Sequence, residues 1–183
     1  AFSTFGGPYV LDMVARAGNA GLRAAWFQKW KIHRRVRPEE FGGTAHNVLT
    51  GAVKAPIHKD FLESEALAET FARFGTYLLP MAYPEGCPAH TSYPAGHATI
   101  AGACMTILKA IFNEDAVLAN PVEADADGLS LVPYAGAPLT VGGELNKLAS
   151  NISLGRDTAG VHWRSDGVEG MRLGERVALS ILR

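Results

Sequence analysis

Three short segments of the sequence carry residue types that together could bind and activate a small anion. In the first, Arg23 to Arg37, six basic residues occur with no Asp or Glu, although the whole chain has 17 Lys and Arg against 18 Asp and Glu. The segment therefore predicts a local positive field on a chain of net charge −1. On a regular helix four of its residues share one face: Trp26, Lys29, His33 and Arg37. That face would present two cations to one oxyanion, although the segment taken alone fits a solvated basic face or a phosphate-backbone patch better.

The second segment is Tyr93-Pro94-Ala95-Gly96-His97, which is typical of a helix start. Small residues there let backbone N–H groups meet an anion directly, and the helix dipole favours negative charge at that end. His97, in the first turn, would sit beside the anion as a proton donor or acceptor. The alternative is an ordinary Pro/Gly helix start with a histidine in its capping turn.

The third segment runs from Gly155 to Asp166 and contains Arg156, His162 and Asp166. His162 and Asp166 are four positions apart, so on a helix the carboxylate could bond one ring nitrogen while the other faces a ligand. A nucleophilic or metal-binding histidine is oriented in this way. The alternative is a surface His/Asp pair, which is common in helical proteins.

The elements that position these segments are predicted to be helices, because apolar residues at spacings of three and four are far commoner than alternation. We expect an all-α protein with at most one small β-hairpin. The predicted helices are 10–36 (with a weak point at Gly18 to Gly21), 59–79, 96–112, 144–154 and 160–182. Phe41-Gly42-Gly43 is predicted as a turn, the hairpin as 129–132 with 138–141, and the core stripe of the second helix as Phe61, Ala68, Phe71, Phe74 and Leu78.

Length and composition exclude several classes of protein. With 183 residues and 48% hydrophobic residues, the chain is expected to form one globular domain, 1–183. It has no apolar run near the roughly 20 residues that span a bilayer, and its net charge argues against a nucleic-acid binder. Cys87 and Cys104 do not have metal-site spacing, and the sequence leaves open whether they are free or paired.

Together the three segments resemble the superfamily of type 2 phosphatidic acid phosphatases and vanadium-dependent haloperoxidases. Its motifs are a Lys followed by Arg-Pro, a Pro-Ser-Gly-His, and an Arg followed by His-x-x-x-Asp. The eight-position separation of Lys29 and Arg37, together with His90, resembles the bromoperoxidase branch, since the phosphatases usually have seven positions and chloroperoxidases carry Phe in place of the extra histidine. The resemblance covers most of the chain and implies a helical bundle.

The resemblance also implies a cofactor, vanadate, and a role for each matching residue. His162 would be the nitrogen ligand of vanadium(V). The groups implied to bind the vanadate oxygens are Lys29, Arg37, Arg156 and the backbone N–H of Gly96. His97 would exchange protons with bound oxygen and incoming peroxide, Lys29 would polarise the peroxide, and His90 would lie near the halide. Trp26 would line the halide side, with a core aromatic as an equal alternative, and Asp166 would orient His162.

The implied reaction is the peroxide-driven oxidation of bromide or iodide to a hypohalous acid equivalent that halogenates a small organic acceptor. Phosphate would fit the same anion site and compete with vanadate. The sequence leaves two other functions open. One is an acid phosphatase of the same superfamily, with His162 as its nucleophile. The other is a non-catalytic helical module that binds oxyanions.

Two features depart from the family pattern. Ala95 stands where the motif has Ser, so one hydroxyl that would bond vanadate is absent, and we expect weaker vanadate binding. The chain also resembles only the C-terminal catalytic part of much longer proteins. We therefore expect a fragment or one processed chain that associates with the remaining portion or forms a homo-oligomer. Export from the cytoplasm is suggested by the resemblance alone.

Overall fold

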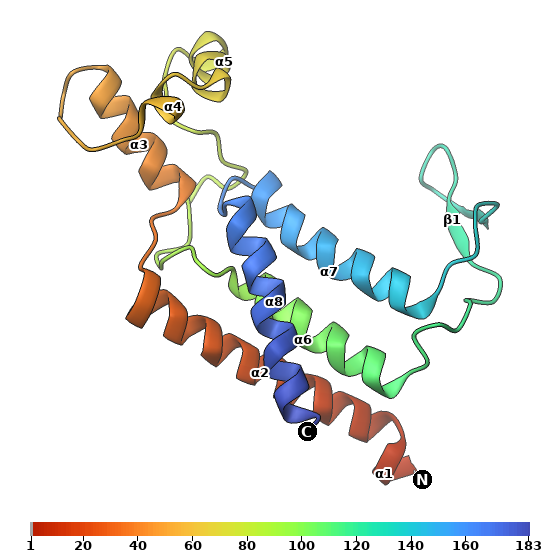
Figure 1. Cartoon of the computed structure of the whole chain (residues 1–183). Coiled ribbons are helices and arrows are strands. Elements are labelled where there is room, and N and C mark those ends of the chain that lie inside the picture. The colour runs from red at the N-terminus through yellow and green to blue at the C-terminus, as the bar shows by residue number, and fades with distance from the viewer. Residues whose placement is uncertain (1) are drawn as a thin grey trace.

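The computed structural model describes residues 2–183, and four long helices that pack on one another form its centre (Figure 1). They are α2 (Gly7–Phe27), α6 (Gly96–Ile111), α7 (Val141–Thr158) and α8 (Arg164–Ile181). α6 contacts each of the other three and packs most extensively against α8. The prediction of an all-α fold is confirmed.

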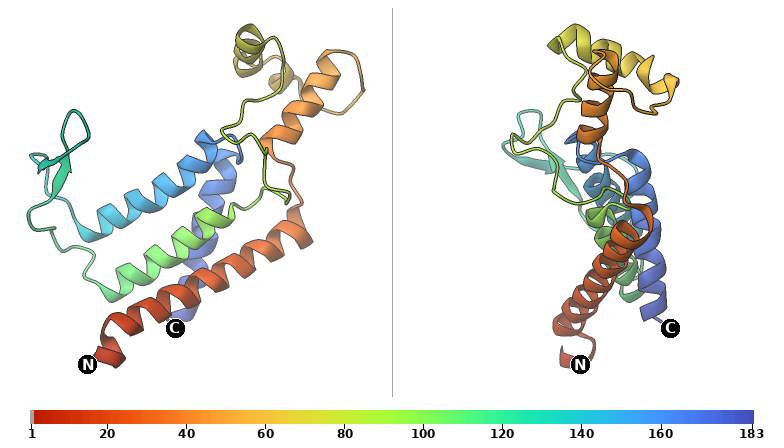
Figure 2. Two further views of the ribbon diagram at one scale, coloured as in Figure 1. Left: turned by 180° about the vertical axis from the view of Figure 1, so that it is seen from behind. Right: turned by 90° about the vertical axis from the view of Figure 1, so that its left-hand side faces the viewer.

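The shorter elements precede or connect these helices. They are α1 (Phe2–Phe5), the π-helix η1 (Gln28–His33), α3 (Pro38–Leu49), α4 (Lys59–Leu62), α5 (Glu65–Phe74), β1 (Val122–Ala124) and β2 (Leu131–Pro133). α3, α4 and α5 lie beyond one end of the four long helices, and the strands lie beyond the other (Figures 1 and 2). Within residues 2–183, no helix combines the length and the apolar character needed to cross a membrane.

Small residues allow the central helices to approach closely. The buried core includes Ala17 on α2, Ala103 and Ile107 on α6, and Ala178 on α8. A Cβ atom placed on Gly174 of α8 would overlap the backbone carbonyl of α6, so only glycine fits this crossing. The close crossing of α6 and α8 brings the starts of both helices together.

The first helix differs from its prediction in two places. α2 passes through 18–21 without a break, because Gly18 and Gly21 are the points where α2 packs against α6. After Phe27 the chain continues as a π-helix, and Arg34 then takes a left-handed conformation with φ 46°. Residues 34–36 are therefore not helical, and the predicted end at 36 is wrong.

The prediction between residues 38 and 79 was largely wrong. Phe41-Gly42-Gly43 lies inside α3 rather than in a turn; Pro38 starts this helix, and Gly42 packs against Leu79. The predicted helix 59–79 is divided into α4 and α5 and ends at Phe74. In its predicted core stripe, Phe71 is 44% exposed, Phe74 53% and Leu78 50%, because these helices project past the four central ones.

The later elements follow the prediction more closely. The helix predicted at 96–112 is confirmed, and α7 is longer than predicted because Thr140 caps its start by accepting from Gly143 N–H at 3.1 Å. α8 begins at Arg164 rather than 160, since Gly160 has φ 75°. A small hairpin exists, but β2 pairs antiparallel with β1 at 122–124 rather than with 138–141.

Candidate functional site

A cavity of about 150 Å³ lies where η1, the start of α6, the end of α7 and the turn before α8 meet. Its wall contains eight of the residues singled out from the sequence: Trp26, Lys29, Arg37, His90, Gly96, His97, Arg156 and His162. Segments that are more than 130 positions apart in sequence thus come together here. The remaining two predicted residues, Ala95 and Asp166, are buried and do not line the cavity, although Asp166 contacts His162 of its wall.

Lys29 is held in the wall by backbone carbonyl groups. Its side chain is 1% exposed, and Nζ donates to Thr91 O at 2.6 Å and to Ser92 O at 2.8 Å. An ammonium group has three N–H donors, so one remains to face a ligand in the cavity. Burial, and then the charge of Arg37, lower the pKa of Lys29 to about 7.

Arg37 is also buried and is also held mainly by carbonyls. Its Nε donates to His90 O at 2.7 Å and its Nη1 to Val161 O at 2.8 Å. The same Nη1 lies 3.3 Å from His162 Nε2. Carbonyls fix the guanidinium without cancelling its charge, so this part of the wall stays positive.

Trp26, Lys29, His33 and Arg37 do not share one helix face as predicted, although Lys29 and Arg37 both line the cavity. The π-helix and the left-handed Arg34 carry Arg37 off the helix and into the wall. His33 instead packs its ring against Tyr93, with ring centres 4.5 Å apart, away from the cavity. Trp26 lines the cavity and meets His90 edge to face at 4.7 Å.

His162 and Asp166 form the predicted pair, but at a helix start rather than along a helix face. His162 precedes α8, and Asp166 lies in its first turn, where Oδ2 accepts from Trp163 N–H at 2.9 Å. The same Oδ2 lies 3.0 Å from His162 Nδ1. With Nδ1 occupied by the carboxylate, Nε2 is the ring nitrogen beside Arg37 and the cavity.

The electrostatics of this pair favour an ionised carboxylate and a neutral imidazole. Burial alone would raise the pKa of Asp166, but hydrogen bonds from His162, the backbone and Arg35 outweigh it and lower that pKa. Burial lowers the pKa of His162, as does Arg37, while the bond to Asp166 opposes them. A neutral imidazole has a lone pair with which to bind a metal or attack an electrophile.

Two further histidines in the wall are also kept neutral by their surroundings. Burial, and then the charges of Arg37 and Lys29, lower the pKa of His90 to about 4. Burial, and then the charge of Arg156, lower the pKa of His97. Both rings are therefore proton acceptors near pH 7.

The third cation, Arg156, comes from the last turn of α7. Among the described residues, its Nε is one of two buried side-chain polar atoms without a hydrogen-bond partner, the other being Asp157 Oδ1. Gly96 is the first residue of α6, whose N-terminal N–H groups have no partners within the helix. An oxyanion in the cavity would supply acceptors to both groups, so the residues present fit such a ligand.

Ala95 occupies the N-cap position of α6 and is 1% exposed. Its N–H donates to Asp166 O at 2.9 Å, which fixes the start of α6 to the start of α8. It is not among the residues that line the cavity.

Arg35, which donates to Asp166 Oδ1 at 2.9 Å, was not predicted from the sequence as a site residue. Nor were Leu22, Pro88 and Ile100, which form apolar parts of the wall. The only feature of the sequence that could have identified Arg35 is its place in the basic segment, and nothing in the sequence marks the three apolar residues. Cys87 and Cys104 are both free.

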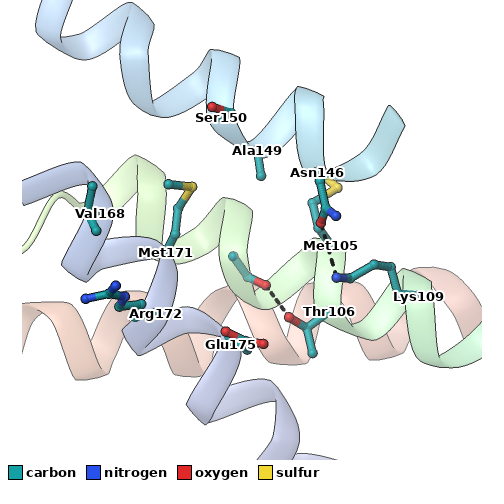
Figure 3. A pocket seen from close by; sticks show the side chains of 11 residues that line it. Met105, Thr106, Lys109, Asn146, Ala149, Ser150, Val168, Met171, Arg172 and Glu175 are labelled. Carbon is teal, nitrogen blue, oxygen red and sulfur yellow. Dashed lines mark hydrogen bonds between the residues drawn. The ribbon is translucent and has the colours of Figure 1, made fainter. Parts of the chain in front are cut away.

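A second, larger groove lies between α6, α7 and α8 and has a volume of about 310 Å³ (Figure 3). Met105, Lys109, Met171, Arg172 and Glu175 are among the residues that line it. Lys109 Nζ donates to Asn146 Oδ1 across this groove at 3.1 Å. It contains none of the predicted site residues, so the smaller cavity is the candidate site.

The fold and the cavity define a class of helical protein in which three cations and three histidines line one small cavity. The chain belongs to the family described as the VCPO second helical-bundle domain, whose model matches residues 11–183. The resemblance found in the sequence is thereby confirmed.

The curated relatives are vanadium-dependent bromoperoxidases. That of Ascophyllum nodosum is 40% identical over 193 residues, which cover 99% of this chain and 34% of that protein. That of Corallina pilulifera is 40% identical over 201 residues, with the same coverage of 99% and 34%. This chain thus spans about a third of the length of these relatives.

A solved structure agrees with the sequence relatives. The homohexameric second vanadate-dependent bromoperoxidase (AnII) of Ascophyllum nodosum superposes with a TM-score of 0.86 at 32% sequence identity. The match covers 100% of this chain and 35% of that one. The helical arrangement described above is therefore that of this family.

Proposed function

We propose that this chain is the vanadate-binding part of a vanadium-dependent bromoperoxidase, which oxidises bromide or iodide with hydrogen peroxide. The observation that carries the proposal is the single cavity in which three cations and three histidines meet. The similarity to bromoperoxidases over 99% of the chain supports it. The reaction consumes one peroxide, one halide and one proton, and it yields hypohalous acid and water.

We propose that the cavity holds vanadate through charge and through one nitrogen. Lys29, Arg37 and Arg156 would donate to its oxygens, with the N–H of Gly96 as a further donor, and His162 Nε2 would be the metal ligand. Arg37 is bonded to carbonyls and not to a carboxylate, so its charge is not cancelled, and a bound anion would favour the ammonium form of Lys29. When bound, vanadate supplies a Lewis acid that activates peroxide without a change in the oxidation state of the metal.

The neutral histidines have separate proposed tasks. His97, whose pKa is lowered, would accept the peroxide proton on its ring and return it to the leaving oxygen. His90 and Trp26, which contact each other edge to face, would form the halide side of the cavity. Arg37 contacts the His90 ring at 3.1 Å, so the imidazole stays neutral and does not trap the halide as an ion pair.

The size of the cavity indicates that the halide is oxidised inside it and that the organic acceptor is halogenated outside it. The cavity of about 150 Å³ has room for an oxyanion and small species such as peroxide and halide. Pockets for drug-sized organic ligands have roughly 300 to 1,000 Å³. We infer that the small organic acceptor meets the oxidised halogen at the mouth or in solution.

Bromination of an organic indicator tests this proposal. The protein is stripped of anions, reloaded with vanadate in phosphate-free buffer, and assayed with peroxide and bromide. We expect bromination that needs vanadate, is inhibited by added phosphate and is absent in H162A. H58A, which changes an exposed histidine that does not line the cavity, is the matched control and should retain full activity.

Phosphate-ester hydrolysis is the second candidate, because a neutral His162 oriented by Asp166 is also suited to nucleophilic attack on phosphorus. The same preparations, without vanadate, are assayed on an aryl phosphate. Phosphate release without bromination under any loading would favour the phosphatase. Anion binding without either activity would leave the oxyanion-binding module as the function.

We also propose that the protein is a homo-oligomer, as the bromoperoxidase AnII is homohexameric. Large apolar side chains are exposed along the end of α2 and η1: Phe27 is 57% exposed, Trp30 47% and Ile32 52%. Exposed apolar clusters of this kind mark surfaces that other protein covers. A molar mass equal to one subunit in light scattering would contradict this proposal.

A further inference from the structure

Arg35 lies outside the cavity, yet it contacts the carboxylate that orients His162. Its Nη1 donates to Asp166 Oδ1 at 2.9 Å and to Ser165 Oγ at 2.8 Å. Its guanidinium also stacks over the Tyr93 ring at 5.1 Å. These contacts fix a side chain that is 43% exposed against one that is fully buried.

The two carboxylate oxygens of Asp166 have different partners. Oδ2 accepts from Trp163 N–H and contacts His162 Nδ1, whereas Oδ1 accepts from Arg35. Without Arg35, Oδ1 would be a buried charged oxygen that has lost its ion pair, which is costly. The carboxylate would then be free to rotate, which weakens its hold on Nδ1.

The backbone explains how one short segment reaches both sides of this pair. The left-handed Arg34, with φ 46°, turns the chain between the π-helix and α3. Arg35 then contacts Asp166 from outside, while Arg37 contacts His162 Nε2 from the cavity at 3.3 Å. The backbone of Arg35 is itself fixed, since its carbonyl accepts from Ser92 N–H at 2.9 Å.

We propose that Arg35 is a positioning residue that acts through Asp166 to keep the hydrogen of His162 on Nδ1 and the lone pair of Nε2 toward the cavity. The inference deepens the proposed function, because it concerns the nitrogen that would bind vanadium. Arg35 would then be necessary for tight vanadate binding, although it does not contact the vanadate. A residue that only stabilised the fold would not select a tautomer of one histidine.

The test is the tautomer of His162 in vanadate-free protein labelled with ¹⁵N-histidine, read from long-range ¹H–¹⁵N correlation spectra and assigned with H162A. The wild type is expected to show Nδ1–H. R35M should raise the population of the Nε2–H form several-fold and weaken vanadate binding about tenfold, as loss of outer-shell partners commonly does. R35K, which retains a positive donor, should restore the wild-type tautomer.

R172M is the matched control, since Arg172 forms an exposed ion pair with Glu169 on the same helix as Asp166. It should leave both readouts unchanged. If circular dichroism shows that R35M does not fold, R35Q replaces it with the same expected shift.

Two results would overturn the inference: an Nε2–H tautomer in the wild type, or a folded R35M with unchanged tautomer and vanadate affinity within twofold of wild type. The tautomer is measured without vanadate or turnover, so absence of bromination would count against the proposed function alone.

Discussion

At the scale of residues, the buried cations of the cavity are held by neutral acceptors. Lys29 and Arg37 donate to the carbonyls of Thr91, Ser92, His90 and Val161. The nearby carboxylate, Asp166, is paired with Arg35 on its far side. The positive charge is thus left for a ligand, and the cost of burying it appears as lowered pKa values.

Lys29 predicts the pH dependence of anion binding. Its pKa of about 7 means that it is neutral above that pH in the free protein, whereas a bound anion requires its ammonium form. Affinity for sulfate, whose own charge is constant in this range, should therefore fall with rising pH from about 7, approaching tenfold per pH unit. Calorimetric titration between pH 6 and 9.5 measures this slope.

K29M is the comparison for that experiment. It should bind sulfate more weakly at pH 6 and show no slope above pH 7. A wild-type affinity that stays constant from pH 7 to 9.5 would contradict the lowered pKa of Lys29, and equal affinities of the wild type and K29M at pH 6 would show that Lys29 does not contact the anion.

Ala95 gives a second prediction, from the hydroxyl that the family motif has and this chain lacks. A95S should strengthen vanadate binding by roughly two- to tenfold, the effect of one neutral hydrogen bond of about 0.5–1.5 kcal/mol. Serine at an N-cap also stabilises its helix, so the midpoint of thermal unfolding is measured alongside. A gain in stability with unchanged vanadate affinity would show that the hydroxyl serves α6 alone.

Most residues of the cavity wall could be predicted from the sequence, but the groups that hold their side chains in place could not. Lys29, Arg37, Arg156 and the histidines are recognisable because charge and motif spacing mark them. The carbonyls of Thr91 and Ser92 carry no side-chain signal, and Arg35 is one basic residue among six. Which arginine bonds a carboxylate depends on the left-handed turn at Arg34, which no local pattern predicts.

At the scale of elements, the crossing of α6 and α8 sets the site, because it brings Gly96 and His162 together. Gly174 occupies this crossing, and G174A would push its new methyl group into the backbone of α6. We expect G174A to lower the free energy of unfolding by about 1–3 kcal/mol, as overpacking does. Chemical denaturation measures this change.

G155A is the matched control, since a Cβ atom at this helical glycine of α7 has no neighbour within 4 Å. It should raise stability by about 0.5–1 kcal/mol through helix propensity. Equal effects of the two substitutions would show that the crossing is not tight.

The helices were predictable where an apolar stripe faces the core, as in 96–112. The failures have physical causes. The prediction placed a turn at Phe41-Gly42-Gly43, although Pro38 favours the first position of a new helix and α3 begins there. The prediction also assumed that Phe71, Phe74 and Leu78 must face inward. α5 and the segment after it lie beyond the core, so these side chains are about half exposed.

At the scale of the whole molecule, the cavity joins segments from η1, α6, α7 and α8, so its ligand should stabilise the entire fold. Sulfate at 100 times its Kd should add about 2.7 kcal/mol to the free energy of unfolding. For a chain of this size, that corresponds to a rise in Tm of roughly 5–10 °C. Chloride at the same ionic strength is the control.

A rise in Tm that is equal with sulfate and chloride would mean a general salt effect, and the cavity would then not be the anion site.

The three segments that line the cavity could be recognised together in the sequence only because their chemistry is complementary. Their meeting in space was an expectation from resemblance, since pairings over more than 100 positions leave no periodic signal in the sequence.

Anomalous scattering at the vanadium absorption edge would locate vanadium in a crystal of the vanadate-loaded protein. We expect one peak inside the cavity, bonded to His162 Nε2 and surrounded by Lys29, Arg37 and Arg156. H162A crystals should show that peak weakened or absent. A vanadium peak elsewhere, or an unchanged peak in H162A, would show that this cavity is not the vanadate site.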